Sequence, residues 1–384
     1  MTTWLSGAVI YQVLVDRFAN TTEMKPDRGE NEFLGGTLNG TRDKLPYLQT
    51  MGVNCLWLSP FYQTDAYHGY HITNFDEVDP HFGTLADLKS LVDDCHRRGM
   101  KIIADWVPNH CSTQHPFFQA ALKDKDCPYR EWFYFNKGTK SYRYFLHYPE
   151  LAKLNLNNPM ARRYMLNNAR YWLSIGLDGF RIDHAIGPGM GFWKALRRLV
   201  NKEFPAVVLL GEVWGAGIAP ADFSTLGMLH KQRRRRWGIN QQELQLDYQA
   251  VFHGVLDFHF AHLLRTHFSK QGKVNADLMA ACLDHFSLGY SNSFLPVLFL
   301  DNHDLDRFLF ECEGKKARLE TALSFLFSFP YPRVIYYGTE ALMTQRQSIL
   351  LPLPNADLQA RQPMDWKSVD TNMVDLIHQL TSIT

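Results

Sequence analysis

One stretch of the chain, Leu177-Asp-Gly-Phe-Arg-Ile-Asp183, has the pattern of a short buried strand that ends in charge. Side chains alternate across the two faces of a strand, so Arg181 and Asp183 share one face while Phe180 and Ile182 take the other. Burying a guanidinium and a carboxylate together is costly unless each has a partner. Taken alone, the pair indicates either a structural ion pair or part of a functional site.

Apolar stretches of this kind recur along the chain and alternate with helical segments, which predicts a parallel sheet with crossover helices. The predicted strands are Val9–Leu14, Asn54–Leu58, Lys101–Trp106, Gly179–Ile182, Val207–Gly211, Gly254–Phe258, Pro296–Leu300 and Arg333–Tyr337. Eight parallel strands separated by helices are what a closed (β/α)₈ barrel requires. We therefore expect an α/β protein with the TIM-barrel fold.

Residues at helix ends predict where several crossover helices begin. Thr84 with Asp87 three positions later predicts a capped helix start, and Pro159 predicts the first turn of another helix. Two further helices are expected over Ala317–Phe329 and Asn372–Ile383. These helices fall between or after predicted strands, as a barrel demands.

The segment after the third strand is too long for an ordinary barrel loop. We predict barrel segments at residues 1–109 and 156–384, with a small excursion domain at 110–155 between strand 3 and helix 3. Few residues follow the eighth strand, so no full C-terminal β domain is expected, whether the chain is naturally short or truncated. The basic run Arg233–Arg236 is read as a solvated face, with a phosphate contact as the alternative.

The composition narrows the possible partners. Basic residues number 40 and acidic residues 39, so a polyanionic partner such as nucleic acid is not indicated. No long apolar run predicts a membrane span, and the N-terminus lacks the pattern of a leader, so a cytoplasmic protein is expected. The six cysteines form no C-x-x-C pair, which predicts neither a zinc cage nor a disulfide framework.

Polar clusters follow four of the predicted strands, at the rim where barrel enzymes carry their catalytic residues. They are Asp105-Trp-Val-Pro-Asn109-His110, Arg181-Ile-Asp183, Gly211-Glu212-Val-Trp and Asp301-Asn-His303-Asp304. Packing alone does not explain four such clusters. They favour the functional interpretation of the Arg181 and Asp183 pair.

In order and spacing, these clusters resemble the four best-known motifs of the α-amylase family, the retaining glycoside hydrolases and transglycosylases built on a (β/α)₈ barrel. The resemblance covers roughly residues 5 to 366 and includes Gly52–Pro60, Tyr67–Tyr70 and Val334–Glu340. It implies that Asp183 is the nucleophile, Glu212 the general acid/base and Asp304 the carboxylate that stabilises the transition state. Retaining glycosidases need two carboxyl groups about 5–5.5 Å apart, which neighbouring strand ends can supply.

The resemblance also implies roles for the surrounding residues. We expect Arg181 to keep Asp183 ionised, and Glu212, beside Val213 and Trp214, to hold its proton to higher pH. Tyr70 is the implied sugar-stacking platform. The remaining implied substrate contacts are His110, His303 and Arg361, and the supporting residues are Asp105, Asn109, His68 and Arg307.

The sequence departs from the family pattern at a calcium site. Many relatives bind calcium through the Asn of the first motif, an Asp in a Leu-Pro-Asp-Leu stretch, and the carbonyl of a His four residues after the nucleophile. Asn109 is present, but Lys153 stands in place of the Asp and Gly187 in place of the His. A lysine ammonium repels a hard cation, so we expect no calcium there and no other cofactor.

Ile186 and His71 also depart from the pattern, and they leave the specificity open. An α-glucan or oligosaccharide is the expected substrate, with hydrolysis or glucosyl transfer as the reaction. A non-catalytic scaffold of the same fold is a minor alternative, as is a metal-dependent hydrolase suggested by His68 and His71. The sequence does not predict an oligomeric state.

Overall fold

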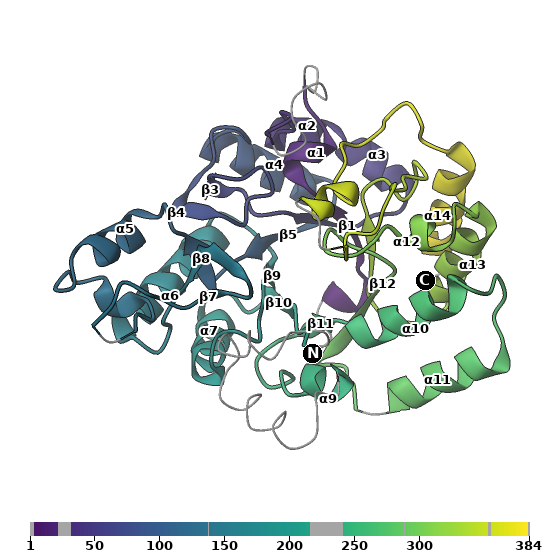
Figure 1. The fold of residues 1–384 in the computed structure, drawn as a ribbon. Helices are drawn as coiled ribbons and strands as arrows, with labels where there is room; N and C mark the ends of the chain where they lie inside the picture. Colours follow the sequence, from purple (N-terminus) through teal and green to yellow (C-terminus); the bar gives the residue numbers. More distant parts are fainter. Residues whose placement is uncertain are drawn as a thin grey trace. The chain divides into compact units, whose positions relative to one another are not determined.

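The computed structural model describes residues 4–21, 32–136, 138–215, 241–287, 289–351 and 355–382. Within these residues, eight parallel strands close into a barrel in the order β1-β13-β12-β11-β10-β9-β5-β2 (Figure 1). The barrel strands are β1 (Val9–Val13), β2 (Cys55–Leu58), β5 (Lys101–Trp106), β9 (Gly179–Ile182), β10 (Val208–Gly211), β11 (Gly254–Leu256), β12 (Leu295–Phe299) and β13 (Arg333–Tyr336). The predicted TIM-barrel fold is confirmed.

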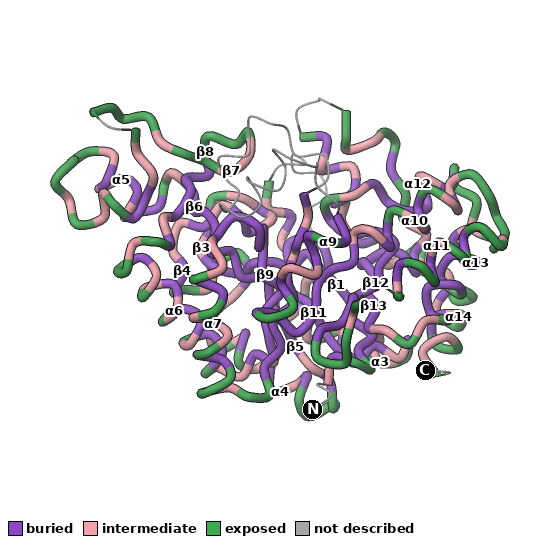
Figure 2. The backbone as a smooth tube through the Cα atoms, turned by 90° about the horizontal axis from the view of Figure 1, so that it is seen from below, coloured by how far each residue is buried: buried purple, intermediate pink, exposed green. Residues whose placement is uncertain are grey.

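The barrel strands are short and almost entirely buried, as Figure 2 shows. In β1, Tyr11 pairs in parallel with Ile335 of β13 on one side and Leu56 of β2 on the other. A parallel strand needs apolar residues on both faces when the barrel interior and a helix layer cover it. This is why the sequence shows near-continuous apolar runs at these positions.

One predicted strand ends two residues earlier than expected, whereas the ends of the others agree within one residue. The Gly254–Phe258 stretch forms β11 only to Leu256, because Asp257 caps helix α10 (Phe258–Phe268) by accepting a hydrogen bond from the Phe260 N–H. A carboxylate at this position satisfies a backbone donor that the first helical turn leaves free. The cap therefore competes with continuation of the strand.

The crossover helices begin where their capping residues predict. Thr84 and Asp87 form a reciprocal capping box at the start of α4, and Pro159 lies in the first turn of α6. The α-helices in the described residues have the following bounds. With α10 given above, the helices are α1 (Val15–Phe18), α2 (Leu38–Asp43), α3 (Leu45–Thr50), α4 (Leu85–Arg97), α5 (Pro116–Lys123), α6 (Pro159–Ser174), α7 (Met190–Glu203), α9 (Gln241–Leu246), α11 (Ala276–Ser287), α12 (Phe308–Glu311), α13 (Lys316–Phe327) and α14 (Thr371–Ser382).

The chain divides into two compact units. One comprises Met1–Ser59, His81–Ile103 and Leu256–Thr384, and the other comprises Pro60–Pro80 and Ala104–Val255. The second unit contains a two-stranded sheet of β3 (Tyr62–Thr64) and β4 (Ile72–Val78), and a three-stranded sheet in the order β6-β8-β7. Its members are β6 (His110–Ser112), β7 (Tyr144–Phe145) and β8 (Tyr148–Lys153).

The β6-β8-β7 sheet lies within the predicted excursion domain, whose limits at 110 and 155 stay a prediction. The aromatic residues of this segment pack on one another, as Phe118 does against Phe133 and Tyr142, with ring centroids 4.9 and 4.7 Å apart. They supply a small core of their own.

Two further expectations concern other parts of the chain. The basic run Arg233–Arg236 lies outside the described residues. In the part of the chain that the structure describes, every helix is too short or too polar to cross a membrane.

Candidate active site

The guanidinium of Arg181, on β9, is the centre of a buried charge network. Its Nη1 contacts Asp105 Oδ1 at 2.6 Å and Asp183 Oδ1 at 3.0 Å, and its Nη2 contacts Glu212 Oε1 at 2.6 Å. Asp105 lies on β5, and Glu212 directly follows β10, so three neighbouring strands of the barrel supply these groups. The structure thus brings the two implied catalytic carboxylates, Asp183 and Glu212, onto one cation.

Burial and charge act in opposite directions on Arg181. Burial by itself lowers the pKa of its guanidinium, but the carboxylates of Asp105, Glu212 and Asp183 raise that pKa well above its usual value. Arg181 is completely buried, so solvent does not screen these interactions. The guanidinium therefore stays charged.

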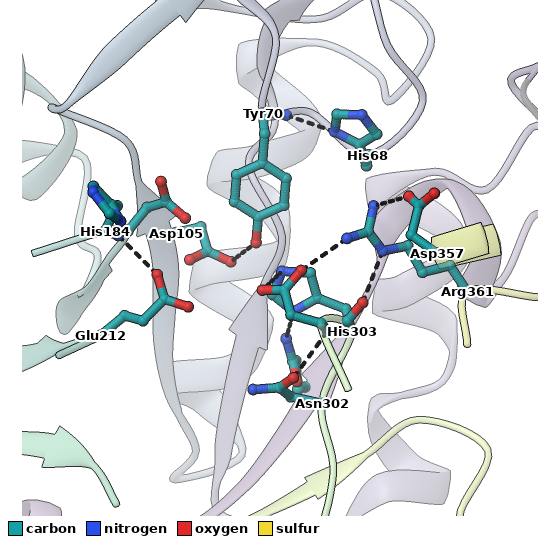
Figure 3. A network of polar contacts seen from close by, with 12 residues as sticks. His68, Tyr70, Asp105, His184, Glu212, Asn302, His303, Asp357 and Arg361 are labelled. Atoms are coloured by element: carbon teal, nitrogen blue, oxygen red, sulfur yellow. Dashed lines mark hydrogen bonds and ion pairs between the residues drawn. The ribbon is translucent and has the colours of Figure 1, made fainter. Parts of the chain in front are cut away.

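Glu212 has a second contact that the sequence did not predict. The backbone N–H of His184 donates to Glu212 Oε2 at 2.8 Å (Figure 3). His184 has a left-handed backbone with φ of 40°, a conformation that costs a non-glycine residue about 1–3 kcal/mol. The only indication in the sequence was that His184 directly follows Asp183. The motifs identify reactive side chains and do not predict contacts made by a backbone N–H.

These contacts add to one expectation, in which Arg181 keeps Asp183 ionised and Glu212, beside Val213 and Trp214, holds its proton to higher pH. In the structure, Glu212 has the guanidinium at one oxygen and an N–H at the other. Both contacts favour the charged carboxylate. Protonation of Glu212 therefore weakens both contacts, although a neutral carboxyl group can still accept through its remaining lone pairs.

Tyr70 is held by the same network. Its hydroxyl donates to Asp105 Oδ2 at 2.9 Å, and its backbone N–H donates to His68 Nδ1 at 3.2 Å (Figure 3). Asp105 thus uses one oxygen for Arg181 and the other for Tyr70. Asp105 and His68, both predicted as supporting residues, thus hold Tyr70 at its hydroxyl and at its backbone N–H respectively.

Asn109 and His110 form a neighbouring pair. The Asn109 Nδ2 lies 3.2 Å from His110 Nδ1, and the His110 ring stacks on Phe145 of β7 at a centroid distance of 4.6 Å. Burial, with nearby His71 and Lys153 acting in the same direction, lowers the pKa of His110 to about 3. His110 is therefore neutral near pH 7, and its buried Nε2 has no hydrogen-bond partner in the described part of the structure.

A second polar network follows β12. His303 Nε2 lies 3.1 Å from Asp304 Oδ2, while Gln12 Nε2, on β1, lies 2.7 Å from His303 Nδ1. Arg361 contacts Asp304 Oδ1 through Nη2 at 2.8 Å. Its Nε contacts the His303 carbonyl at 2.8 Å (Figure 3). Arg361, predicted as a sugar ligand, is thus an ion-pair partner of Asp304.

Gln12 was not predicted as a site residue. A polar side chain inside the apolar run of β1 was the available signal. Because its amide nitrogen can only donate, His303 Nδ1 accepts and the ring proton lies on Nε2. Arg307, a predicted supporting residue, donates from Nη1 to the Tyr337 carbonyl at 2.5 Å and lies over the Tyr336 ring. It supports the end of β13.

The geometry agrees with the comparisons to known proteins. The model of the alpha-amylase catalytic domain matches residues 12–225 and 237–375. The chain belongs to the α-amylase family. Its match to that model covers most of the sequence and includes the Arg181 network together with the segment after β12.

Several relatives of the α-amylase family resemble this chain over most of its length. Alpha-amylase 2 of Dictyoglomus thermophilum is 34% identical and is aligned over 99% of this chain and 63% of its own length. The intracellular maltogenic amylase of Bacillus subtilis is 31% identical over 88% of this chain and 56% of its own length. The chain thus spans less than two thirds of these curated relatives.

A solved structure gives the same fold. The alpha-amylase of Geobacillus thermoleovorans, complexed with acarbose, superposes with a TM-score of 0.80 at 27% identity, covering 100% of this chain and 79% of that one. The metal-hydrolase alternative gains no support from the structure. Among the residues described here, no three His, Cys, Asp or Glu side chains converge as a metal site.

Proposed function

We propose that this α-amylase family member is a retaining glycoside hydrolase that cleaves α-glucosidic bonds of starch, maltooligosaccharides or related α-glucans. The observation that carries the proposal is the shared guanidinium, which holds Asp183 and Glu212 from adjacent strands. A retaining mechanism needs two such carboxyl groups at short range. The amylase names of the relatives support the substrate class.

In the first step, an Asp183 oxygen attacks the anomeric carbon while Glu212 donates a proton to the leaving glycosidic oxygen. A covalent glycosyl-enzyme forms and the bond to the leaving sugar breaks. In the second step, Glu212 removes a proton from water, which attacks the anomeric carbon and releases Asp183. Two inversions leave the product in the α configuration.

The other predicted residues assist this reaction. Arg181 lowers the energy of the Asp183 carboxylate as it leaves the covalent intermediate. The Asp304 side chain is 41% exposed although Arg361 and His303 contact its oxygens, so we assign it to a contact with the sugar. We assign Tyr70, His110 and His303 to contacts with the sugar and place the enzyme in the cytoplasm, as the name of the intracellular relative suggests.

The test compares wild type with Asp183→Asn and Glu212→Gln on maltooligosaccharides, starch, pullulan and cyclodextrin. Asp183→Asn should lower kcat by a factor on the order of 10⁴ or more. The exposed Asp93→Asn serves as the matched control and should keep wild-type turnover. Wild-type kcat in Asp183→Asn would refute the assignment.

The products separate the two carboxylate roles and the two reactions. Added azide should yield a β-glycosyl azide with Asp183→Gly, because one inversion remains, and an α-glycosyl azide with Glu212→Ala. The reverse pattern would exchange the two assignments. Longer oligosaccharides at high donor concentration would show that transfer to sugar competes with hydrolysis.

A further inference from the structure

The Lys153 ammonium occupies an unusual buried position. Lys153 is 5% exposed and lies on β8 opposite His110 of β6. Its Nζ donates to Asn109 Oδ1 at 2.7 Å and to the Gly187 carbonyl at 3.2 Å. A buried ammonium is stable only when oxygen acceptors replace its water, and these two oxygens do so.

The same positions are the calcium ligands that the family resemblance implies. Two of the oxygen ligands in that set are present, the Asn109 side chain and the backbone carbonyl at 187. Both accept hydrogen bonds from Lys153. The third position carries an ammonium in place of a carboxylate. Calcium takes six to eight oxygen ligands, often including carboxylates, so the donor set does not fit the ion.

The absence of a side chain at Gly187 leaves room for the Asn109 amide beside it. A Cβ atom added at residue 187 would lie 2.0 Å from Asn109 Oδ1, closer than any real contact. Any side chain at this position would displace the Asn109 amide or the local backbone. The two departures from the family pattern, Lys153 and Gly187, thus meet in space beside the Asn109 side chain.

The ammonium also decides how Asn109 faces His110. Because Asn109 Oδ1 accepts from Lys153, its Nδ2 is the atom that faces His110 Nδ1 at 3.2 Å. An amide nitrogen can only donate, so Nδ1 accepts and the proton of the ring lies on Nε2. His110 Nε2 therefore offers an N–H donor.

We propose that the Lys153 ammonium is a built-in cation that takes the place of the family's calcium and, through Asn109, positions His110 with Nε2–H as its free donor. Two measurements test this proposal, the melting temperature of the chain and the tautomer of the His110 ring. Neither depends on the reaction proposed above, so the inference stands or falls separately from it.

The first experiment measures Tm of the full chain in EDTA and in millimolar calcium. Wild type should melt at the same temperature in both. Lys153→Met should melt about 2–6 °C lower in both, because two buried acceptors lose their donor. Lys153→Asp should melt lower in EDTA and recover with calcium, since it restores a carboxylate to the donor set. The exposed Lys125→Asp is the control and should show no calcium response.

Three results would overturn the cation proposal: a wild-type Tm that falls in EDTA, a Lys153→Met Tm equal to wild type, or no calcium response in folded Lys153→Asp. If Lys153→Asp does not fold, wild type and Lys153→Met decide the matter.

The second experiment reads the His110 tautomer from ring ¹⁵N shifts at pH 7, with His110→Gln identifying the signals. Wild type should show a protonated Nε2 and an unprotonated Nδ1. In Lys153→Met the two shifts should move toward each other as Asn109 loses its fixed orientation. Unchanged shifts in that variant would disprove the positioning role.

Discussion

Replacing Arg181 by methionine tests whether burial gives its ion pairs their importance. Arg181→Met keeps most of the side-chain volume but removes the cation that Asp105, Asp183 and Glu212 share. The three carboxylates would then repel one another in a site where Asp105 is fully buried. We expect a large loss of stability as well as of activity.

The magnitude follows from the distances and the burial. At about 3 Å and an effective dielectric constant near 20, each pair contributes roughly 5 kcal/mol of attraction. Desolvation of the ions offsets several kcal/mol apiece, so the net loss should resemble that of other broken buried pairs, about 3–5 kcal/mol. At about 2.1 cal/mol/K of unfolding entropy per residue, that corresponds to a fall in Tm of about 4–6 °C for 384 residues.

Arg170→Met is the matched control. Arg170 also pairs with a carboxylate through two nitrogens, contacting Glu203 at 2.6 and 3.0 Å, but its side chain is 43% exposed. Solvent screening should limit its loss to about 1 kcal/mol or less. Urea unfolding of both variants at pH 7 makes the comparison. Equal losses of free energy in the two variants would refute the reasoning.

Two further changes test stability elsewhere in the chain. Burial lowers the pKa of His253 to about 3, and its Nδ1 accepts a hydrogen bond from the Leu209 N–H. Between pH 7 and pH 5 this histidine therefore gains a proton only in the unfolded chain. The free energy of unfolding should fall by about 2 kcal/mol over that range. His253→Gln should remove that part of the pH dependence of the urea midpoint, whereas the exposed His378→Gln should not; identical slopes would contradict this. Thr84→Ala removes the acceptor for the Asp87 N–H and should cost about 1 kcal/mol. Thr84→Ser should keep most of it, and thermal melts of equal midpoint for the two variants would argue against the cap.

The strands and helix starts were predictable because their signals are local. A buried parallel strand needs a continuous apolar run, and Lys101–Trp106 and Gly179–Ile182 form strands over the very residues predicted. Thr84 and Asp87 predict a helix start because both partners of the capping box lie within one turn of the chain. The strand after Gly254 ended early where another local signal, the Asp257 cap, prevailed.

Site contacts between residues far apart in the chain were only partly predictable. Polar residues at strand ends indicated a site, since the strand ends of a barrel meet at one rim. The sequence could not show that Arg181 reaches Glu212 as well as Asp183, or that Gln12 orients His303 across most of the chain length. Those contacts depend on side-chain directions that follow from strand register.

By itself the sequence determined the barrel, the order of its motifs and the residues expected to react, because periodicity and spacing are properties of short segments. It also showed that Lys153 and Gly187 depart from the family pattern. Only the tertiary structure decided that these two departures meet, with the ammonium at hydrogen-bond distance from the Gly187 carbonyl. The physical reason is that a buried charge is stable only when polar groups such as oxygens surround it. Those oxygens come from segments that only the folded chain brings together.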